Sequence, residues 1–566
     1  MCWRPLFFFL KPPSRNDLWS VCIVDFFITW IEAALSRKGG GGGAFFRLTR
    51  ETAVLYTERS LTEKVMNVRI EIQGLPNPER FQRPLEVMSE LFFESAALSF
   101  TPLPEADISV SFTVNENGRI TVSGTLADRT SGRVEEAGHE HEAPAEADGK
   151  AREKQLKNAV FHVYITLLER YTGIVQPWGI LTGVRPVKLL HQLLRSGMTK
   201  EEAHRKLAQE YLVTKEKIEL MQAIVDRQLT VVPDLYDLAH EVSIYIGIPF
   251  CPTKCAYCTF PAYAINGRQG SVDAFLAGLH YEMEAVGRFL RERGIRITTI
   301  YYGGGTPTSI TAEEMDRLYA HMYNVFPDVD RIREITVEAG RPDTITPEKL
   351  DVLKKWRIDR ISINPQSYIQ ETLKAIGRHH TVEETINKFH LARKMGMNNI
   401  NMDLIIGLPG EGLPEFTHTL AETERLMPES LTVHTLSFKR ASEMTKNKQK
   451  YKVAGREEIQ AMMKAAEEWT SKHGYVPYYL YRQKNILGNL ENVGYALPGH
   501  ESIYNIMIME EQQSIIGLGC GASSKFVDPK TRKLTRQANP KEPKVYNEHF
   551  MEYTEEKLTI MAALFG

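Results

Sequence analysis

Residues 242–258 have the sequence VSIYIGIPFCPTKCAYC. The first seven residues are mostly apolar and rich in isoleucine and valine, as is typical of a strand buried in a parallel sheet. Three of the chain's six cysteines, Cys251, Cys255 and Cys258, follow directly. The stretch therefore predicts a buried strand that ends in a cysteine-rich loop.

Further apolar runs follow this strand and alternate with helix-like segments. They are ITTIYYGGG, EITVEAG, RISINPQ, INMDLIIGLPG and SLTVHTLSF. Strands that alternate with helices in this way predict a parallel sheet covered by helices, either open or closed into a barrel. In such folds ligands bind at the carboxyl ends of the strands. The polar and glycine residues predicted at these ends are Gly303, Glu338, Gln366 and Asp403.

The spacing of the three cysteines, C-x3-C-x2-C, suits a cubane iron–sulfur cluster. Thiolates bind iron, and a loop this short can wrap three corners of a cluster. A tetrahedral zinc site requires a fourth ligand, and the nearest histidine downstream is His280. Zinc with a distant fourth ligand and unliganded core cysteines are the alternatives. Three protein ligands for four irons would leave one iron open to a small molecule.

The cysteine motif resembles the signature of the radical S-adenosylmethionine enzymes. Residues 302–308, YGGGTPT, end a predicted strand and are similar to the motif that these enzymes use for the methionine amino group. The resemblance implies a [4Fe-4S] cluster bound by Cys251, Cys255 and Cys258, with S-adenosylmethionine on the open iron. It also implies the fold of the family, an α/β structure built on a partial (β/α)6 barrel.

Within this superfamily, residues 242–526 resemble the oxygen-independent coproporphyrinogen III oxidases, which hold two S-adenosylmethionine molecules side by side. The residues that the resemblance assigns to the first molecule are Tyr245, Gly304 and Glu338. Those that it assigns to the second are Tyr257, Gly305, Thr306, Gln366, Arg378 and Asp403. A carboxylate can accept hydrogen bonds from an ammonium or a ribose hydroxyl group, and an arginine can clamp a carboxylate. An ion pair within the barrel is the alternative for Glu338 and Arg378.

The resemblance also implies a reaction. In this family a 5′-deoxyadenosyl radical takes a β-hydrogen from a substrate propionate, and coproporphyrinogen III becomes protoporphyrinogen IX. The implied electron donor is flavodoxin or a ferredoxin-type protein. Residues 181–186, 338–343, 478–484 and 488–494 are similar to the HemZ-type branch of the family, the coproporphyrinogen dehydrogenases.

The residues after the last cysteine differ from those of the well-studied bacterial enzymes. Thr259 and Phe260 stand where those enzymes carry a further cysteine after Cys258. This aromatic form also occurs in relatives that carry haem. A haem chaperone on the same barrel is therefore the main alternative function, and a radical methyltransferase or a haem-degrading relative is another.

The composition indicates a globular protein without a general affinity for polyanions. The chain has 566 residues, 25% charged residues and a formal net charge of −2. Its six cysteines are too few and too unevenly spread for a disulfide framework, which favours the reducing cytosol. No dedicated basic RNA-binding module is apparent, so we expect no nucleic-acid partner. We also expect the protein to be a cytoplasmic monomer without a membrane partner.

Residues 1–65 do not match the rest of the chain. Residues 18–35 are apolar, but Asp25 and Glu32 interrupt them at a cost of about 2–3 kcal/mol for a central acid. Five consecutive glycines, residues 39–43, follow. We expect this segment to be a disordered extension or an artefact of the chosen start site, and the folded protein to begin near Met66. A membrane span or signal peptide is the alternative.

The remaining sequence divides into five predicted parts. Residues 66–132 have alternating strands and a helical stretch, which predict a small α+β domain. Residues 133–153 are highly charged and predict a linker or a charged helix, with His139 and His141 in solvent. Residues 154–238 predict a helical connector, residues 239–450 the barrel, and residues 451–566 a carboxyl-terminal α+β domain.

Several short segments allow two interpretations. Residues 178–186, WGILTGVRP, predict either a packed loop or one that faces a ligand. Residues 475–484 carry four tyrosines with Arg482 and Lys484, which suit either a flat anionic tetrapyrrole or a strand in a buried sheet. We expect Cys520 to be a small packed residue, and His379 and His380 to lie in a loop or at the surface.

Overall fold

The computed structural model describes residues 65–566 apart from 94, 102–104, 117–118, 143–148, 184, 266–269, 440 and 484–485. The predicted extension, with its apolar segment 18–35, and Lys484 lie outside the described residues. Of the helices that are described, none is both long and apolar enough to cross a membrane.

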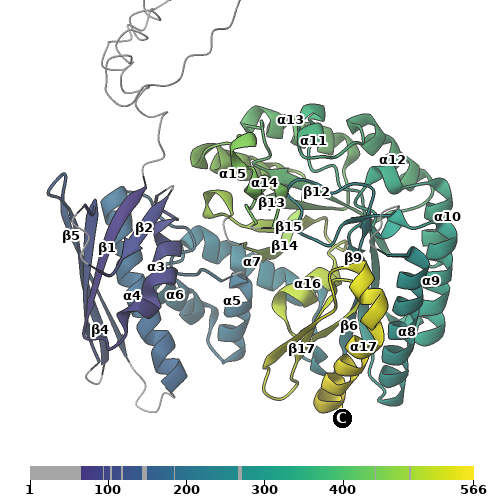
Figure 1. The fold of residues 1–566 in the computed structure, drawn as a ribbon, viewed down its shortest axis with the longest axis horizontal. Coiled ribbons are helices and arrows are strands. Elements are labelled where there is room, and N and C mark those ends of the chain that lie inside the picture. The colour runs from purple at the N-terminus through teal and green to yellow at the C-terminus, as the bar shows by residue number, and fades with distance from the viewer. Residues whose placement is uncertain are drawn as a thin grey trace, which may run out of the picture. The chain divides into compact units, whose positions relative to one another are not determined.

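The small amino-terminal domain is a five-stranded sheet with helices on one face (Figure 1). Its strands, in the spatial order β2-β1-β3-β4-β5, are β1 Met66–Gln73, β2 Ala96–Ser99, β3 Ile108–Asn115, β4 Arg119–Asp128 and β5 Val134–Glu142. Its helices are α3 Gln82–Ser89 and α4 Gly149–Thr172. Buried and exposed residues alternate along β3 and β4, as expected for a sheet with one covered face.

The predicted linker at 133–153 is wrong for residues 134–142, because they form strand β5. This strand pairs antiparallel with β4, from Val134 opposite Ala127 to Glu142 opposite Arg119. Charged residues are common on exposed edge strands because they block pairing with other chains, and this concealed the strand from a composition-based prediction. His139 is half-buried, since its ring stacks at 3.9 Å on His162 of α4, and burial lowers its pKa to about 4.

Three further helices connect this domain to the barrel. They are α5 Pro186–Arg195, α6 Lys200–Tyr211 and α7 Lys215–Val231. The predicted capping box begins α6: Thr199 accepts from the backbone N–H of Glu202 at 3.2 Å, and Glu202 accepts from the N–H of Thr199 at 2.8 Å. Such a cap stabilises a helix by about 1 kcal/mol.

The predicted partial (β/α)6 barrel is confirmed. Six parallel strands pair in chain order: β6 Val242–Ile248, β9 Ile297–Gly304, β10 Glu334–Glu338, β11 Arg360–Ser362, β12 Ile400–Ile406 and β13 Ser430–Thr435. The helices between them are α8 Val272–Glu292, α9 Ala312–Val325, α10 Pro347–Lys355, α11 Gln370–Ala375, α12 Val382–Lys394 and α13 Leu413–Leu426. Figure 1 shows these helices along the outer side of the strands.

The carboxyl-terminal segment extends the barrel sheet at both of its ends and does not form a sheet of its own. At one end β16 Ser514–Gly519 pairs with β6, followed by β17 Ser523–Val527 and β18 Leu534–Ala538. At the other end β15 Asn492–Ala496 pairs with β13, followed by β14 Val476–Tyr481. The helices of this segment are α14 Glu443–Lys446, α15 Arg456–Lys472, α16 Ile503–Glu510 and α17 Pro543–Phe565. Tyr478 and Tyr479 are buried in β14, which agrees with the strand interpretation of this tyrosine-rich segment.

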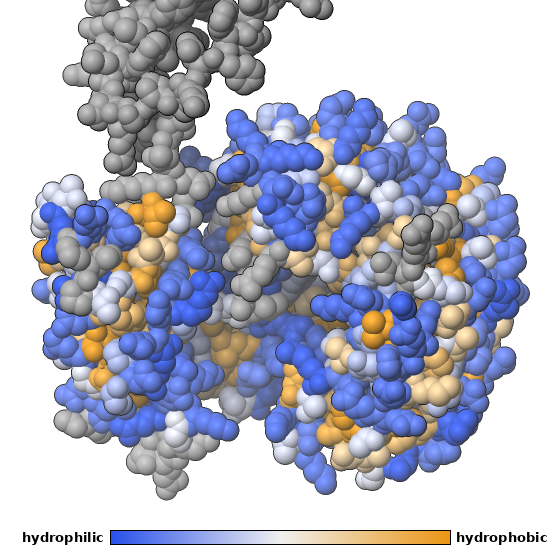
Figure 2. Space-filling view, in the orientation of Figure 1, coloured by the Kyte–Doolittle hydropathy of each residue, from blue (hydrophilic) through white to orange (hydrophobic). Residues whose placement is uncertain are grey.

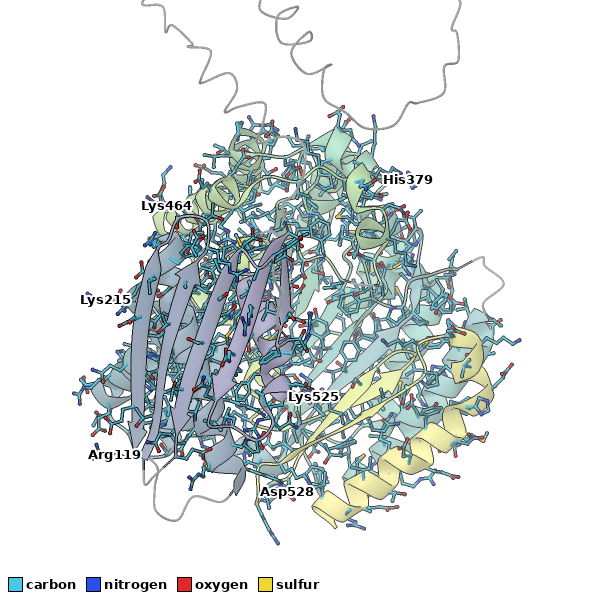
Figure 3. All side chains as sticks on the ribbon, turned by 60° about the vertical axis from the view of Figure 1, so that its left-hand side comes forward. Arg119, Lys215, His379, Lys464, Lys525 and Asp528 are labelled. Atoms are coloured by element: carbon cyan, nitrogen blue, oxygen red, sulfur yellow. The ribbon has the colours of Figure 1, made fainter. Side chains whose placement is uncertain are left out.

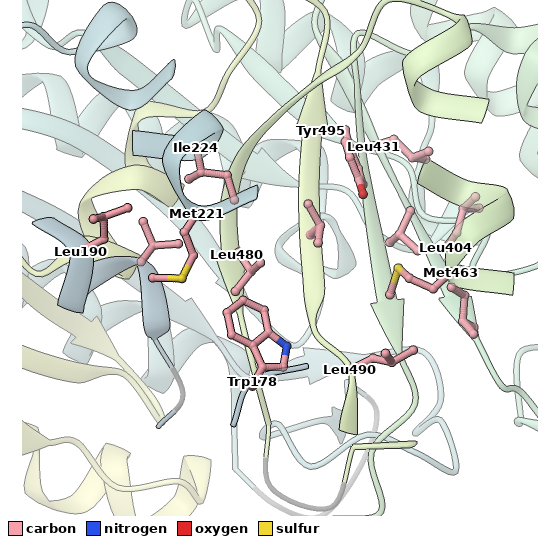
Figure 4. Packing of buried hydrophobic residues seen from close by; sticks show 14 of the residues in the cluster. Trp178, Leu190, Met221, Ile224, Leu404, Leu431, Met463, Leu480, Leu490 and Tyr495 are labelled. Atoms are coloured by element: carbon pink, nitrogen blue, oxygen red, sulfur yellow. The ribbon is translucent and has the colours of Figure 1, made fainter. Parts of the chain in front are cut away.

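The loop that carries Trp178 is packed into the core between the connector and β14 (Figure 4). The Trp178 side chain is fully buried, and its Nε1–H donates to Glu491 at 2.8 Å. Lys217 of α7 pairs with the other oxygen of Glu491 at 2.7 Å. At the end of the same loop, Arg185 pairs with Glu511. The packed interpretation of residues 178–186 therefore holds for the described part of this loop.

A second buried ion pair fixes the last helix to the barrel. Lys557 of α17 and Glu282 of α8 have no exposed surface, and their charged atoms are 2.5 Å apart. Glu282 also accepts hydrogen bonds from the side chains of Asn539 and Tyr546 and from the N–H of Gly519. Cys520, beside this group, is 1% exposed, as expected for a packed residue.

Candidate active site

The cysteine loop begins where β6 ends, in the short strand β7 Phe250–Cys251. Cys251 and Cys255 are buried and Cys258 is partly exposed. The Sγ atom of Cys251 lies 3.2 Å from Oγ1 of Thr306, so the glycine-rich strand end contacts the loop directly. Burial raises the pKa of the Cys251 thiol to about 11, so iron has to displace a proton from it when a cluster assembles.

The loop suits a multi-iron cluster better than a single ion. No three His, Cys, Asp or Glu side chains of the described residues gather as one metal ion requires. A cubane cluster makes a different demand, because each thiolate binds a different iron. Arg341, which is only 3% exposed and pairs with Asp343 at 2.9 Å, also contacts the loop, since its Nη1 lies 3.9 Å from Sγ of Cys255. Its guanidinium therefore places a hydrogen-bond donor beside a cluster thiolate.

The glycines after β9 let the strand end pass close to the cysteine loop. The backbone N–H groups of Gly305 and Thr306 each donate at 2.7 Å, to the carbonyls of Ile248 and Phe250. A Cβ atom on Gly305 would lie 2.5 Å from the Phe250 carbonyl oxygen, and Gly304 has φ +108°. Glycine is thus required at these two positions because the strand end packs against the loop. The ligand contact that the sequence predicts for Gly304 and Gly305 stays a prediction.

Gly303 leaves room on the interior side of the barrel. A Cβ atom there would lie 3.2 Å from Oε2 of Glu338 and 3.2 Å from the ring of Tyr245. The Tyr301 hydroxyl donates to Oε1 of Glu338 at 2.5 Å, which leaves Oε2 facing Gly303. Burial raises the pKa of Glu338 to about 7, against the opposing effect of this hydrogen bond. Glu338 therefore changes charge near neutral pH.

Stacked tyrosine rings lie beside Glu338. The ring of Tyr301 stacks on Tyr504 of α16 at 4.4 Å and lies parallel to Tyr245 at 6.2 Å. Sequence reasoning selected only Tyr245. Adjacent residues of a strand face opposite sides, so the Tyr301–Tyr302 pair in ITTIYYGGG signals one tyrosine inside the barrel and one against the helices. Tyr302 is the outer one, since it contacts Met322 of α9.

Asp403 on β12 is held by polar side chains from neighbouring strands. Asn364 and Asn401 each donate to its carboxylate at 2.8 Å, and Nε2 of His434 lies 3.6 Å from it. Tyr481 contacts the other ring nitrogen of His434 at 3.1 Å. Burial alone would raise the pKa of Asp403, but the interactions with His434 and Asn401 hold it below its usual value. Asp403 is therefore the site carboxylate that stays charged.

Gln366 and Arg378 are placed in the same region with unused polar atoms. Gln366 has φ +67° and bridges to β12, because its N–H donates to the Asp403 carbonyl at 2.9 Å. A positive φ in a residue other than glycine costs about 1–3 kcal/mol and is typical of binding sites. Arg378 is 5% exposed and donates to the carbonyls of Asn364 and Gly340. No described carboxylate forms an ion pair with Arg378, so the barrel ion pair considered from the sequence is not found.

Several buried polar atoms here have no partner among the described residues. They are Oδ1 of Asn364, Oε1 of Gln366, Nε of Arg378, Oγ of Ser362 and the hydroxyl of Tyr504. Buried polar groups are nearly always hydrogen-bonded, so these atoms point to a polar ligand with both donors and acceptors. S-adenosylmethionine, with an ammonium, a carboxylate, ribose hydroxyls and an adenine, has that chemistry.

The structure also gives the positions of three other residues that the sequence analysis singled out, Tyr257, His379 and His380. Tyr257, within the cysteine loop, packs against the apolar cluster that contains Leu373 and Ile376, and burial raises its pKa. His379 is exposed at the surface, as predicted (Figure 3). His380 lies in the same loop, as predicted, but is buried at 2% exposed, with a pKa lowered to about 3 by burial and by nearby Arg378. The turn after α11 directs this imidazole inward.

Comparisons with known proteins identify the family of this chain. Residues 245–422 match the family model of the radical SAM superfamily. The oxygen-independent coproporphyrinogen-III oxidase-like protein HemZ of Bacillus subtilis is 64% identical over 88% of this chain and 99% of its own length. The heme chaperone HemW of the same species is 30% identical over 50% of this chain and 70% of its own. The solved structure of coproporphyrinogen III oxidase (HemN) from Escherichia coli aligns over 60% of this chain and 74% of that one, with 22% identity and a TM-score of 0.46.

Proposed function

The chain belongs to the radical SAM superfamily and, within it, to the HemZ family of oxygen-independent coproporphyrinogen-III oxidase-like proteins, and from this premise we propose that it oxidatively decarboxylates coproporphyrinogen III. The observation that carries the proposal is the set of unpartnered polar atoms around Gln366 and Arg378, at the strand ends beside the cysteine loop. Unpartnered polar atoms also occur elsewhere among the described residues, but here several gather beside Asp403, where a bound S-adenosylmethionine would supply their partners.

The cluster would be bound by Cys251, Cys255 and Cys258. With S-adenosylmethionine bound, the cluster would supply the radical chemistry that removes one hydrogen atom from the β-carbon of a substrate propionate. The overall reaction would also pass one electron from the substrate to an acceptor and release the carboxyl group as carbon dioxide, which would leave a vinyl group. Two such rounds would convert coproporphyrinogen III into protoporphyrinogen IX.

The side chains of the barrel would orient the cofactors and exclude water. Glu338 would accept from the first S-adenosylmethionine through Oε2, because Tyr301 occupies Oε1. Asp403 and Gln366 would accept from the hydroxyl or amino groups of a second molecule, and Arg378 would donate one hydrogen bond to its carboxylate through the unpartnered Nε. The stacked rings of Tyr245, Tyr301 and Tyr504 keep water from this side of the reacting groups.

Haem binding is the second candidate function. It is favoured by the similarity to the heme chaperone HemW and by Phe260 in place of a further cysteine. On this alternative the same barrel would bind the tetrapyrrole without changing it.

Anaerobic incubation of the reconstituted, reduced protein with S-adenosylmethionine and coproporphyrinogen III distinguishes the two. Mass spectrometry should detect the singly and doubly decarboxylated tetrapyrroles in step with 5′-deoxyadenosine. If 5′-deoxyadenosine forms while the tetrapyrrole stays intact, decarboxylase activity is refuted. Absorbance on addition of haem then tests the chaperone function.

A further inference from the structure

Residues 439–452 form a strongly basic stretch in a chain whose formal net charge is −2. They include six basic residues, Lys439, Arg440, Lys446, Lys448, Lys450 and Lys452, and one acid, Glu443. Lys446, Lys450 and Lys452 are exposed. None of these three ammonium groups pairs with a carboxylate among the residues that the structure describes. The stretch therefore presents net positive charge to solvent.

This stretch is attached directly to the cysteine loop. The N–H of Met444, in the middle of the stretch, donates at 3.0 Å to the carbonyl of Ala256, which lies between Cys255 and Cys258. Met444 is 1% exposed and packs in one apolar cluster with Ala256 and Ile376. Figure 1 shows α14, which contains Met444 and Lys446, on the same upper side of the barrel as α11.

The neighbouring surface is also basic and contains one exposed aromatic ring. Lys254 of the cysteine loop and Lys374 of α11 are exposed, and neither forms an ion pair with a described residue. Phe260, two residues after Cys258, is 58% exposed, and the ammonium group of Lys439 lies 5.9 Å from its ring centre. Over this side of the barrel the surface in Figure 2 is predominantly hydrophilic. We call the exposed side chains of Lys254, Lys374, Lys446, Lys450, Lys452 and Phe260 the basic rim.

We propose that the basic rim is the docking surface for a small acidic electron-transfer protein that reduces the cluster. The inference rests on the proposed function, because only a redox cluster requires such a partner. The reduced carrier gives up one electron and leaves oxidised by one electron, and the cluster gains that electron. Opposite charges steer such encounters and raise association rates by about 10–1,000-fold at low salt. The exposed Phe260 supplies an apolar contact next to a cluster ligand.

The anionic tetrapyrrole is a poorer occupant of the basic rim. A substrate that reacts inside the barrel needs basic groups on the inner side of the strands. Lys446, Lys450 and Lys452 instead lie on α14 and in the segment after it, exposed to solvent, while Met444 of α14 packs in one apolar cluster with Ala256 of the cysteine loop. Flexible, fully hydrated lysines favour transient contact with a macromolecule over fixed binding of a small ligand.

The test is a triple charge reversal, Lys446→Glu with Lys450→Glu and Lys452→Glu. We would measure the Kd for an acidic flavodoxin and the rate at which reduced flavodoxin reduces the reconstituted cluster. At about 20 mM salt the variant should bind at least about tenfold more weakly and be reduced at least about tenfold more slowly than the parent. At about 500 mM salt the two proteins should converge, because salt screens exposed charges.

A second triple variant provides the matched control. Lys215→Glu with Lys530→Glu and Lys533→Glu changes the net charge equally, in α7 and in the β17–β18 turn. Figure 3 shows Lys215 and Asp528, in that turn, far from His379 at the end of α11. The control should bind and accept electrons like the parent. Equal losses in both triple variants would overturn the inference.

Reduction by dithionite separates this inference from the proposed function. Dithionite needs no docking surface, so both triple variants should form 5′-deoxyadenosine at the parental rate with it. A loss in the Lys446, Lys450 and Lys452 variant under dithionite, or a weaker affinity for coproporphyrinogen III, would assign the basic rim to the substrate instead. If the parent protein itself forms no 5′-deoxyadenosine with dithionite, the proposed function fails, while the binding measurement still decides the docking surface.

Discussion

This protein contains two clusters of buried polar side chains, one around Glu282 and one around Gln366 and Arg378. They differ in how many of their polar atoms are hydrogen-bonded. Around Glu282, both carboxylate oxygens accept two hydrogen bonds each, from Lys557, Asn539, Tyr546 and the N–H of Gly519. Around Gln366 and Arg378, several equally buried polar atoms have no partner among the described residues. The first group is complete without a ligand, and the second is not. Pairing, and not burial or polarity alone, separates a structural group from a binding site.

The largest predicted effect comes from a substitution that prevents the iron–sulfur cluster from binding beside the incompletely paired side chains. Cys255→Ser should abolish cluster assembly and S-adenosylmethionine cleavage, because three thiolates are needed for three irons. The fold should persist, since Ala256 still packs with Leu373 and Ile376 and serine is close to cysteine in size. Absorbance and iron content after reconstitution, with circular dichroism for the fold, measure both effects.

Cys520→Ser is the matched control, because Cys520 is equally buried but belongs to the complete region around Glu282. It should retain the cluster and the cleavage activity. Full 5′-deoxyadenosine formation by Cys255→Ser would contradict the assignment of the cysteine loop.

The next largest effect comes from removing the cation of the fully paired cluster around Glu282. Lys557→Met leaves the Glu282 carboxylate buried with no cation, which should destabilise the protein by about 3–5 kcal/mol. Denaturant unfolding followed by fluorescence measures this loss. The affinity for S-adenosylmethionine of the protein that stays folded should not change. A variant as stable as the parent would show that the ion pair is not needed for the fold.

The barrel was predictable because its signals are local. Apolar runs such as those that became β6 and β12 alternate with amphipathic helices, and the cysteines and glycines mark the strand ends. Long-range pairing gives no such signal. Neither β16 nor β15 carries a local mark of its partner, so the extension of the sheet at both ends was missed. Strand β5 was missed because its exposed edge is as charged as a linker.

The candidate site was predictable only in part, for the same physical reason. Family resemblance named Glu338, Gln366, Arg378 and Asp403, which the fold does bring to one region. Glu338 ends β10 and Gln366 follows β11, whereas Asp403 lies in the middle of β12, not at its end as predicted, and Arg378 follows α11. The resemblance did not name Arg341, Tyr301 or His434, whose importance comes from what they contact in three dimensions. Arg341 lies beside Cys255, and His434 lies beside Asp403. A sequence shows residue types, whereas the partner of each buried polar atom becomes known only from the fold.

A conservative change in the incomplete group should affect binding and leave the fold intact. Glu338→Gln removes a charge that would accept from the ammonium of S-adenosylmethionine, and we expect affinity to fall by about 10–100-fold. The folded pKa of about 7 lies above the ordinary value of 4.5, so the parent loses stability as the pH rises through this range. At pH 8 the variant should therefore be at least as stable as the parent, unlike Lys557→Met.

Calorimetry at pH 6.5 in two buffers of different ionisation enthalpy tests the charge directly. The parent should release protons when S-adenosylmethionine binds, because the bound ammonium favours the ionised carboxylate. Glu338→Gln should release fewer. Identical proton release by the two proteins would remove Glu338 from the ligand site.

The smallest predicted effect distinguishes two halves of the incomplete group. Asp403→Asn should weaken the second S-adenosylmethionine site by a few fold more than the first, since the amide keeps the hydrogen bonds from its neighbours only in part. His434→Gln should reproduce a fraction of this loss, because His434 acts only through Asp403. Equilibrium binding with one and two equivalents of ligand resolves the sites. Equal weakening of both sites by Asp403→Asn would mean that the polar atoms around β12 and those around Glu338 serve one ligand, and that the site is undivided.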